Sequence, residues 1–153
     1  PPRSILSSSS AASDVYKRQL YISTDHCRCM QAWLLVGLGG FIGAVARFLL
    51  SDWLGDRFYG FPAGTFAVNV LGSLLLGIIV GAFWKSLITD DARFFLGVGI
   101  MGAFTTMSAF SYEAMRLPNQ GEYFRFSIYS AGSVVLCIMA VSVGYFLTTS
   151  LAS

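Results

Sequence analysis

Charged residues are scarce in this sequence. Asp, Glu, Lys and Arg make up only 12% of its 153 residues, which is about half of their usual share in a soluble domain. The formal net charge is +2, and neither a basic stripe nor a nucleic-acid motif is present. The chain lacks the electrostatic footprint of a nucleic-acid-binding protein, so we expect no nucleic acid among its partners.

Histidine and cysteine are rarer still, with one His and three Cys. His26, Cys27 and Cys29 lie together, but no further ligand stands elsewhere to complete a zinc site. Cys137 lies in an apolar run and is typical of a small buried hydrophobe, so disulfides are not supported. No nucleophile–base pair or phosphate loop is found, and an enzyme is therefore the least favoured class.

Apolar residues, by contrast, are abundant. They form 55% of the chain, with 13 Phe and 16 Gly, and the mean hydropathy is +0.65. Membrane helices tolerate or favour both Phe and Gly. The length fits one domain. The composition therefore indicates an integral membrane protein.

The first 29 residues are set apart by their composition. Residues 9–19 read SSAASDVYKRQ, which resembles a translated sequencing adapter, and a Ser-rich disordered tail would equally lack a fold. We expect residues 1–29 to be a non-native or disordered extension. Residues 30–153, which begin at Met30, are expected to form the membrane domain, with six basic and six acidic residues.

Four apolar stretches follow Met30, at about residues 32–50, 62–84, 92–115 and 124–147. Each approaches or exceeds the roughly 20 residues that a helix needs to cross a bilayer. Nearly all the charges lie between them. We predict an all-α membrane protein with four transmembrane helices.

The basic residues in the connections between spans give little indication of how the protein is oriented in the membrane. Lys85 and Arg93 lie on one side of the membrane, and Arg57, Arg116 and Arg125 on the other, whereas most membrane proteins concentrate basic residues on the cytoplasmic side. Two interpretations stay open. The protein simply has few charges, or it inserts in both orientations and pairs antiparallel with itself.

Polar residues inside the spans are expensive and therefore informative. Arg47, about one turn from the end of the first span, either extends to the interface or contacts an ion. Asn69 in the second span either bonds a neighbouring helix or donates to an anion. Tyr129 and Ser133 in the fourth span share a face at i, i+4 spacing.

The third span holds the densest polar segment, GAFTTMSAFSYE at 102–113. Two adjacent β-branched residues, Thr105 and Thr106, follow a Gly-rich run and favour a helix break. Broken backbone at membrane depth is tolerated only inside protein or along a cavity. The carbonyls that it frees can bind a cation.

Three segments together carry a family resemblance: GGFIGAVAR at 39–47, GTFAVNVLG at 64–72, and the segment at 102–113. In this order and spacing they resemble the Fluc (CrcB) family of fluoride channels, over essentially the whole chain after Met30. The resemblance implies a fluoride-selective channel that exports fluoride passively across the inner or plasma membrane. It also implies an antiparallel, dual-topology homodimer, or a heterodimer with a paralogue, and a structural sodium ion at the dimer centre.

The resemblance also implies roles for particular residues. The backbone carbonyls of Gly102 and Thr105 would bind sodium, and Arg47 would attract anions near the vestibule. The fluoride path would be lined by Asn69, Thr106, Met107, Ser108, Phe110, Tyr129 and Ser133.

One position departs from the family pattern, which usually has two Phe residues at i, i+3 in the third span. Here the first is Met107, and only Phe110 is aromatic. An aromatic ring edge carries the positive end of the ring quadrupole and can face an anion. Met107 offers a thioether and a methyl group instead.

The strongest rival is a small multidrug-resistance-type exporter, which also has four spans. Proton coupling of that kind needs a carboxylate deep in the first span, and none is present. Glu113, near the end of the third span, is the one acidic candidate in a span, and it equally suits an interfacial or helix-packing role. A non-transporting assembly factor is a third possibility, which the mid-membrane hydroxyls disfavour.

Overall fold

The structure is a computed structural model that describes the backbone of residues 6–55 and 61–152, and side chains from Met30 onward within those ranges. Contacts divide the chain into two units, residues 1–34 and 35–153. The first unit contains the beginning of α1, which runs from Leu6 to Gly55. The segment expected to be an extension is therefore helical from Leu6, and the domain boundary expected at Met30 stays a prediction.

The second unit contains the rest of α1 and all the other elements. These are α2 (Ala63–Trp84), α3 (Asp90–Ala92), the π-helix η1 (Arg93–Met101), α4 (Gly102–Phe104), α5 (Met107–Asn119) and α6 (Tyr123–Leu151). No strand occurs among the described residues. The prediction of an all-α fold is confirmed.

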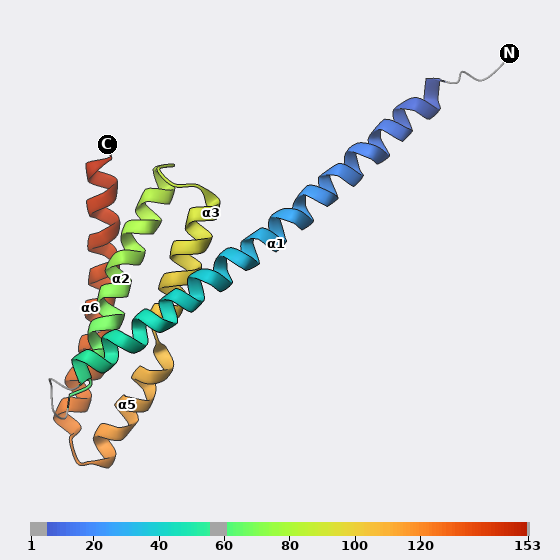
Figure 1. Ribbon diagram of the computed structural model, residues 1–153. Coiled ribbons are helices and arrows are strands. Elements are labelled where there is room, and N and C mark those ends of the chain that lie inside the picture. The colour runs from blue at the N-terminus through green and yellow to red at the C-terminus, as the bar shows by residue number, and fades with distance from the viewer. Residues whose placement is uncertain (1–5, 56–60, 153) are drawn as a thin grey trace. The chain divides into compact units, whose positions relative to one another are not determined.

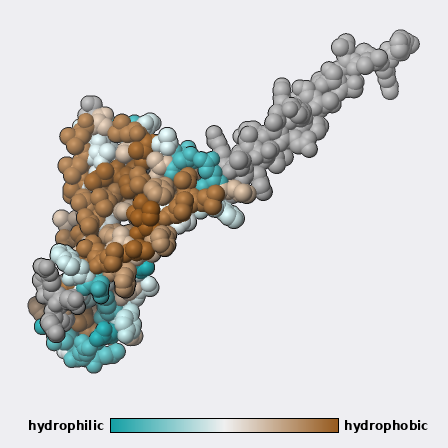
Figure 2. All heavy atoms as spheres, viewed as in Figure 1, coloured by the Kyte–Doolittle hydropathy of each residue, from teal (hydrophilic) through white to brown (hydrophobic). Residues whose placement is uncertain are grey.

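Four segments are long and apolar enough to cross a membrane: Met30–Gly55, Ala63–Trp84, Asp90–Asn119 and Tyr123–Leu151. Large hydrophobic side chains such as Phe41, Phe48, Ile138 and Phe146 lie exposed on α1 and α6. Figure 2 shows this apolar surface over the helices and a polar end near the α5–α6 connection. Such a surface suits lipid or another membrane helix rather than water. The four-span prediction is confirmed.

Helices α2 and α6 lie side by side along most of their length (Figure 1). They run in the same direction, because Gly77 approaches the backbone of Val141 whereas Gly81 approaches Thr148 further along. A Cβ at Gly77 would collide with the Val141 carbonyl oxygen. The small residues thus let two helix backbones approach each other closely.

A second close contact joins α1 to η1. A Cβ at Gly39 would collide with the Phe95 carbonyl oxygen, and one at Gly43 with the Ile100 carbonyl oxygen. In a π-helix each N–H bonds the carbonyl five residues back, a rare geometry that is often found at functional sites. This contact fixes the helix that leads directly into the polar segment at 102–113.

The α5–α6 connection is a tight turn. Gly121 has φ +80° and follows the end of α5, where Gln120 N–H donates to the Arg116 and Leu117 carbonyls. This conformation favours glycine because it carries no Cβ. The turn places the start of α6 beside the end of α5, which brings Tyr129 toward the third span.

Candidate functional site

The third span is interrupted at Thr105 and Thr106. Helix α4 ends at Phe104 and α5 begins at Met107. Between them Thr105 has φ −76° and ψ 151°, and Thr106 has φ −146° and ψ 117°, both extended. The two adjacent threonines thus lie where helical hydrogen bonding stops.

Asn69, on the neighbouring helix α2, hydrogen-bonds the backbone at this interruption. Its Oδ1 accepts a hydrogen bond from Thr106 N–H at 2.7 Å, and its Nδ2 donates to the Thr106 carbonyl at 3.1 Å. One side-chain amide therefore satisfies both backbone groups of a residue that has left the helix, as a neighbouring strand would. Asn69 therefore bonds a neighbouring segment of the third span, which is the first of the two interpretations given above.

The carbonyls of Gly102 and Thr105 are among those that lose their helical donors at the interruption. Thr106 N–H, which a continuous helix would direct to Gly102, donates to Asn69 instead. Ala109 N–H, which would reach the Thr105 carbonyl, donates to Thr106 Oγ1 at 3.3 Å. Neutral carbonyl oxygens at a helix break suit a hard monovalent cation. The residues that the resemblance assigned to sodium therefore fit such an ion chemically.

Hydroxyl groups gather just after the interruption. Thr106 Oγ1 caps the start of α5 through Ala109 and lies 3.1 Å from Ser108 Oγ. Thr106 is buried, whereas Ser108 and the neighbouring Met107 are exposed on the isolated chain, Met107 by 69%. Asn69, Thr106 and Ser108 thus form one polar cluster with an exposed edge.

A second cluster lies further along α5. Glu113 Oε1 accepts from Thr65 Oγ1 at 2.8 Å, and Oε2 accepts from Tyr129 Oη at 2.7 Å. The Tyr129 ring packs on Phe110 with centroids 5.2 Å apart, and both side chains are buried. The Glu113 carboxyl group thus joins α2, α5 and α6 through two hydrogen bonds from hydroxyl groups.

Thr65 and Glu113 were not predicted as site residues. Two signals were available in the sequence. Thr65 lies one turn before Asn69 at i, i+4 spacing, which places both on one face of α2, and Glu113 is an acidic residue inside an apolar span. Their pairing depends on helix packing, which spacing along one helix does not specify.

The other predicted residues lie apart from these hydrogen bonds. Ser133 is buried on α6, and its Oγ has no hydrogen-bond partner among the described residues. Arg47 is half-buried on α1. Cys137 is a half-buried free thiol, while the side chains of His26, Cys27 and Cys29 lie outside the described residues. The roles of Ser133 in the fluoride path and of Arg47 near the vestibule stay predictions.

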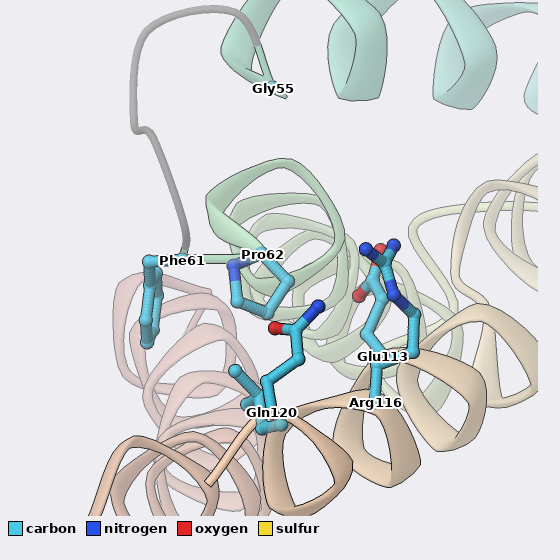
Figure 3. Close-up of a pocket in the computed structure, with 7 residues that line it drawn as sticks. Gly55, Phe61, Pro62, Glu113, Arg116 and Gln120 are labelled. Carbon is cyan, nitrogen blue, oxygen red and sulfur yellow. The ribbon is translucent and has the colours of Figure 1, made fainter. Parts of the chain in front are cut away.

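A pocket of about 250 Å³ opens beside the second cluster. Figure 3 shows Glu113, Arg116 and Gln120 on its α5 side, facing Phe61 and Pro62 at the start of α2. Gly55 at the end of α1 and Leu117 complete the lining. The pocket thus lies where several helices end, at the polar end of the unit.

These features define a class: a multi-pass membrane protein in which a broken third span is held by polar groups of its neighbours. Residues 34–145 match the family model described as CrcB-like protein, Camphor Resistance (CrcB). The chain belongs to this family.

Curated relatives agree with the match. A protein of Methanosarcina barkeri named fluoride-specific ion channel FluC 3 is 42% identical over 75% of this chain and 88% of its own length. FluC 1 of Methanosarcina acetivorans is 39% identical over 81% and 95%, and FluC of Phenylobacterium zucineum is 44% identical over 77% and 95%. These relatives are named as ion channels and not as enzymes, in agreement with the expected class.

Proposed function

We propose that the protein is a fluoride channel through which fluoride leaves the cell passively. The observation that carries this proposal is the roughly 40% identity, over at least three-quarters of the chain, to relatives named fluoride-specific ion channels. The polar clusters support it, because buried hydroxyl, amide and ring-edge groups are what a dehydrated anion needs inside a membrane.

The path that we propose follows the two polar clusters. Thr106 and Ser108 supply hydroxyls at the interruption, and Asn69 fixes the backbone there. Ser133 Oγ, which is buried without a partner among the described residues, has a hydrogen to offer an anion. Phe110 and Tyr129 provide ring edges further along. These donors carry no full charge, so an anion that replaces water with them can still leave.

The exposed edge of the first cluster suggests a second copy. Ser108, Met107 and the backbone of Gly102 are exposed on the isolated chain, and polar groups facing lipid would be costly. We propose that an antiparallel partner, the same chain or a paralogue, covers them in the inner or plasma membrane. If the partner is the same chain, a reporter fused to the C terminus should appear on both sides of the membrane, and detection on one side only would exclude the antiparallel homodimer.

Sodium is the ion that we propose for the carbonyls of Gly102 and Thr105. The positive charge of sodium would attract these two carbonyl oxygens, which have lost their helical N–H donors. The side chains around the interruption remain responsible for the path itself.

Fluoride efflux from liposomes containing the purified chain tests the function. Efflux should be fast, should need no proton gradient, and should greatly exceed chloride efflux. A parallel assay of proton-driven uptake of an organic cation tests the multidrug-exporter alternative. Glu113, the acidic candidate for that alternative, lies in the third span rather than the first and already accepts two hydroxyl hydrogen bonds. Cation uptake without fluoride efflux would overturn the proposal.

A further inference from the structure

The turn between α2 and α3 exposes apolar side chains at the place where two membrane spans end (Figure 1). The second span ends at Trp84, and the third begins at Asp90. Trp84 is 73% exposed, and Leu87, which lies between the two spans, is 61% exposed. Tryptophan is enriched at membrane–water interfaces, because its ring is apolar and its N–H is polar. The turn therefore suits the headgroup level of a bilayer.

This turn is held in one conformation by hydrogen bonds to the end of α2. Ser86 N–H donates to the Phe83 carbonyl at 2.9 Å. Leu87 N–H donates to the Ala82 carbonyl, also at 2.9 Å. Ser86 has φ +58°, the left-handed conformation that commonly closes the end of a helix. The exposed side chains of the turn are thus carried on a fixed backbone.

Arg93 lies beside the turn, with its guanidinium fixed by aromatic rings. Its Cζ lies 4.6 Å from the centre of the Phe83 ring and 4.8 Å from that of the Phe94 ring. Its Nε is buried without a hydrogen-bond partner among the described residues, whereas 37% of the side chain is exposed. The N–H groups of a guanidinium lie in its plane, and their fork matches the oxygens of a phosphate. A guanidinium held in this way is suited to a phosphate group.

An acidic side chain lies next to Arg93 without hydrogen-bonding it. Asp90 Oδ1 is 3.8 Å from Arg93 Nε, and the Asp90 side chain is 71% exposed. That distance is longer than a hydrogen bond. Residues 85–93 carry two basic and two acidic side chains, Lys85, Asp90, Asp91 and Arg93. Anionic lipids are attracted by clusters of basic residues, whereas adjacent opposite charges complement a zwitterionic headgroup.

We propose that this turn binds the headgroup of a phospholipid that carries a phosphate and a primary ammonium, as phosphatidylethanolamine does. Arg93 donates to the phosphate, the ammonium donates to Asp90, and Trp84 and Leu87 contact the lipid below the headgroup. Both polar contacts are then charge-assisted hydrogen bonds. A choline headgroup has no N–H for Asp90, and a glycerol headgroup has no positive charge for it. Fluoride conduction plays no part in this recognition.

Native mass spectrometry of the purified chain tests the site, with ethanolamine, choline and glycerol phospholipids of identical acyl chains added to the detergent at equal concentration. The wild type should retain the ethanolamine lipid most. Arg93→Gln should weaken this retention roughly tenfold or more, because it removes a charged hydrogen bond. Asp90→Asn, at an exposed position, should lower retention of the ethanolamine lipid to that of the choline lipid.

Arg125→Gln is the matched control. It removes the same charge from an arginine that also has a carboxylate partner three residues before it, Glu122, but lies at the start of α6, at the opposite end of the spans. It should leave lipid retention unchanged. Size-exclusion chromatography shows whether each variant is folded, and Asp90→Asn alone decides the question if Arg93→Gln is not.

Equal retention of the three lipids by the wild type would overturn the inference. An unchanged preference in Asp90→Asn, or an equal loss in Arg125→Gln, would do the same. A preference for the anionic glycerol lipid would assign the turn to attraction by its basic residues alone. Displacement of the ethanolamine lipid by millimolar inorganic phosphate would assign Arg93 to free phosphate, and either result would also contradict the proposed headgroup site.

Discussion

Asn69 shows how one side chain stabilises a backbone that has left its helix. Its amide both accepts from and donates to Thr106, and Thr106 in turn caps α5. The sequence predicted the interruption from two adjacent threonines after a glycine-rich run. It left the role of Asn69 open, because the partner comes from another helix 37 residues along the chain. Local propensity favours a break, and only tertiary packing supplies the group that holds it.

Replacing Asn69 with Ala should therefore destabilise the protein. Thr106 N–H and carbonyl would both lose their partner in a half-buried site, with an expected loss of about 1–3 kcal/mol in the free energy of unfolding. Thermal unfolding in detergent measures this change. Ser73→Ala is the control on the same helix, because its hydroxyl bonds only the Asn69 carbonyl of its own helix and should contribute little. Equal stability of the two variants would contradict the role assigned to Asn69.

At the scale of elements, the four spans followed from apolar length alone. Their ends shifted by a few residues, since turns such as the one at Gly121 set where a helix stops. The π-helical geometry of η1 was not predictable, because it depends on the close contact with α1 at Gly39 and Gly43 as well as on its own sequence.

The close contact between α2 and α6 leads us to predict that a larger residue at Gly77 destabilises the protein. Gly77→Ala should destabilise the chain by about 1–3 kcal/mol, because the new methyl group meets the Val141 backbone, which cannot move aside as a flexible side chain would. Gly132→Ala on α6 is the matched control. Nothing lies within 4 Å of a Cβ there, so the better helix propensity of Ala should leave stability unchanged or higher by up to about 1 kcal/mol. Similar unfolding temperatures for both variants would contradict this packing.

At the scale of the whole molecule, the exposed polar edge around the interruption favours an assembly of more than one chain. Hydropathy alone does not show which face of a membrane helix meets lipid and which meets a partner. These polar residues could therefore be identified from the sequence, but what surrounds them could not. The family resemblance supplied the expectation of a partner and a bound ion.

Removal of sodium tests the ion that we propose at the carbonyls of Gly102 and Thr105. An ion that binds only the folded assembly stabilises it by about 2.7 kcal/mol at a concentration of 100 times its Kd. Exchange of sodium for a large organic cation at equal ionic strength should therefore lower the unfolding temperature and release monomer, as measured by size-exclusion chromatography with light scattering. Identical behaviour in both salts would remove sodium from the account.

The central claim is that fluoride crosses the membrane along the polar clusters of the second, third and fourth spans. Fluoride efflux from liposomes, recorded with a fluoride electrode for the wild-type chain and for Phe110→Ile, tests it most directly. Ile keeps the site apolar but lacks the aromatic ring that packs against Tyr129, and with it the positive ring edge. We expect fast efflux from the wild type and at least a tenfold loss, equivalent to about 1.4 kcal/mol in the barrier, in the variant. Equal efflux from both, with both proteins intact, would contradict the account.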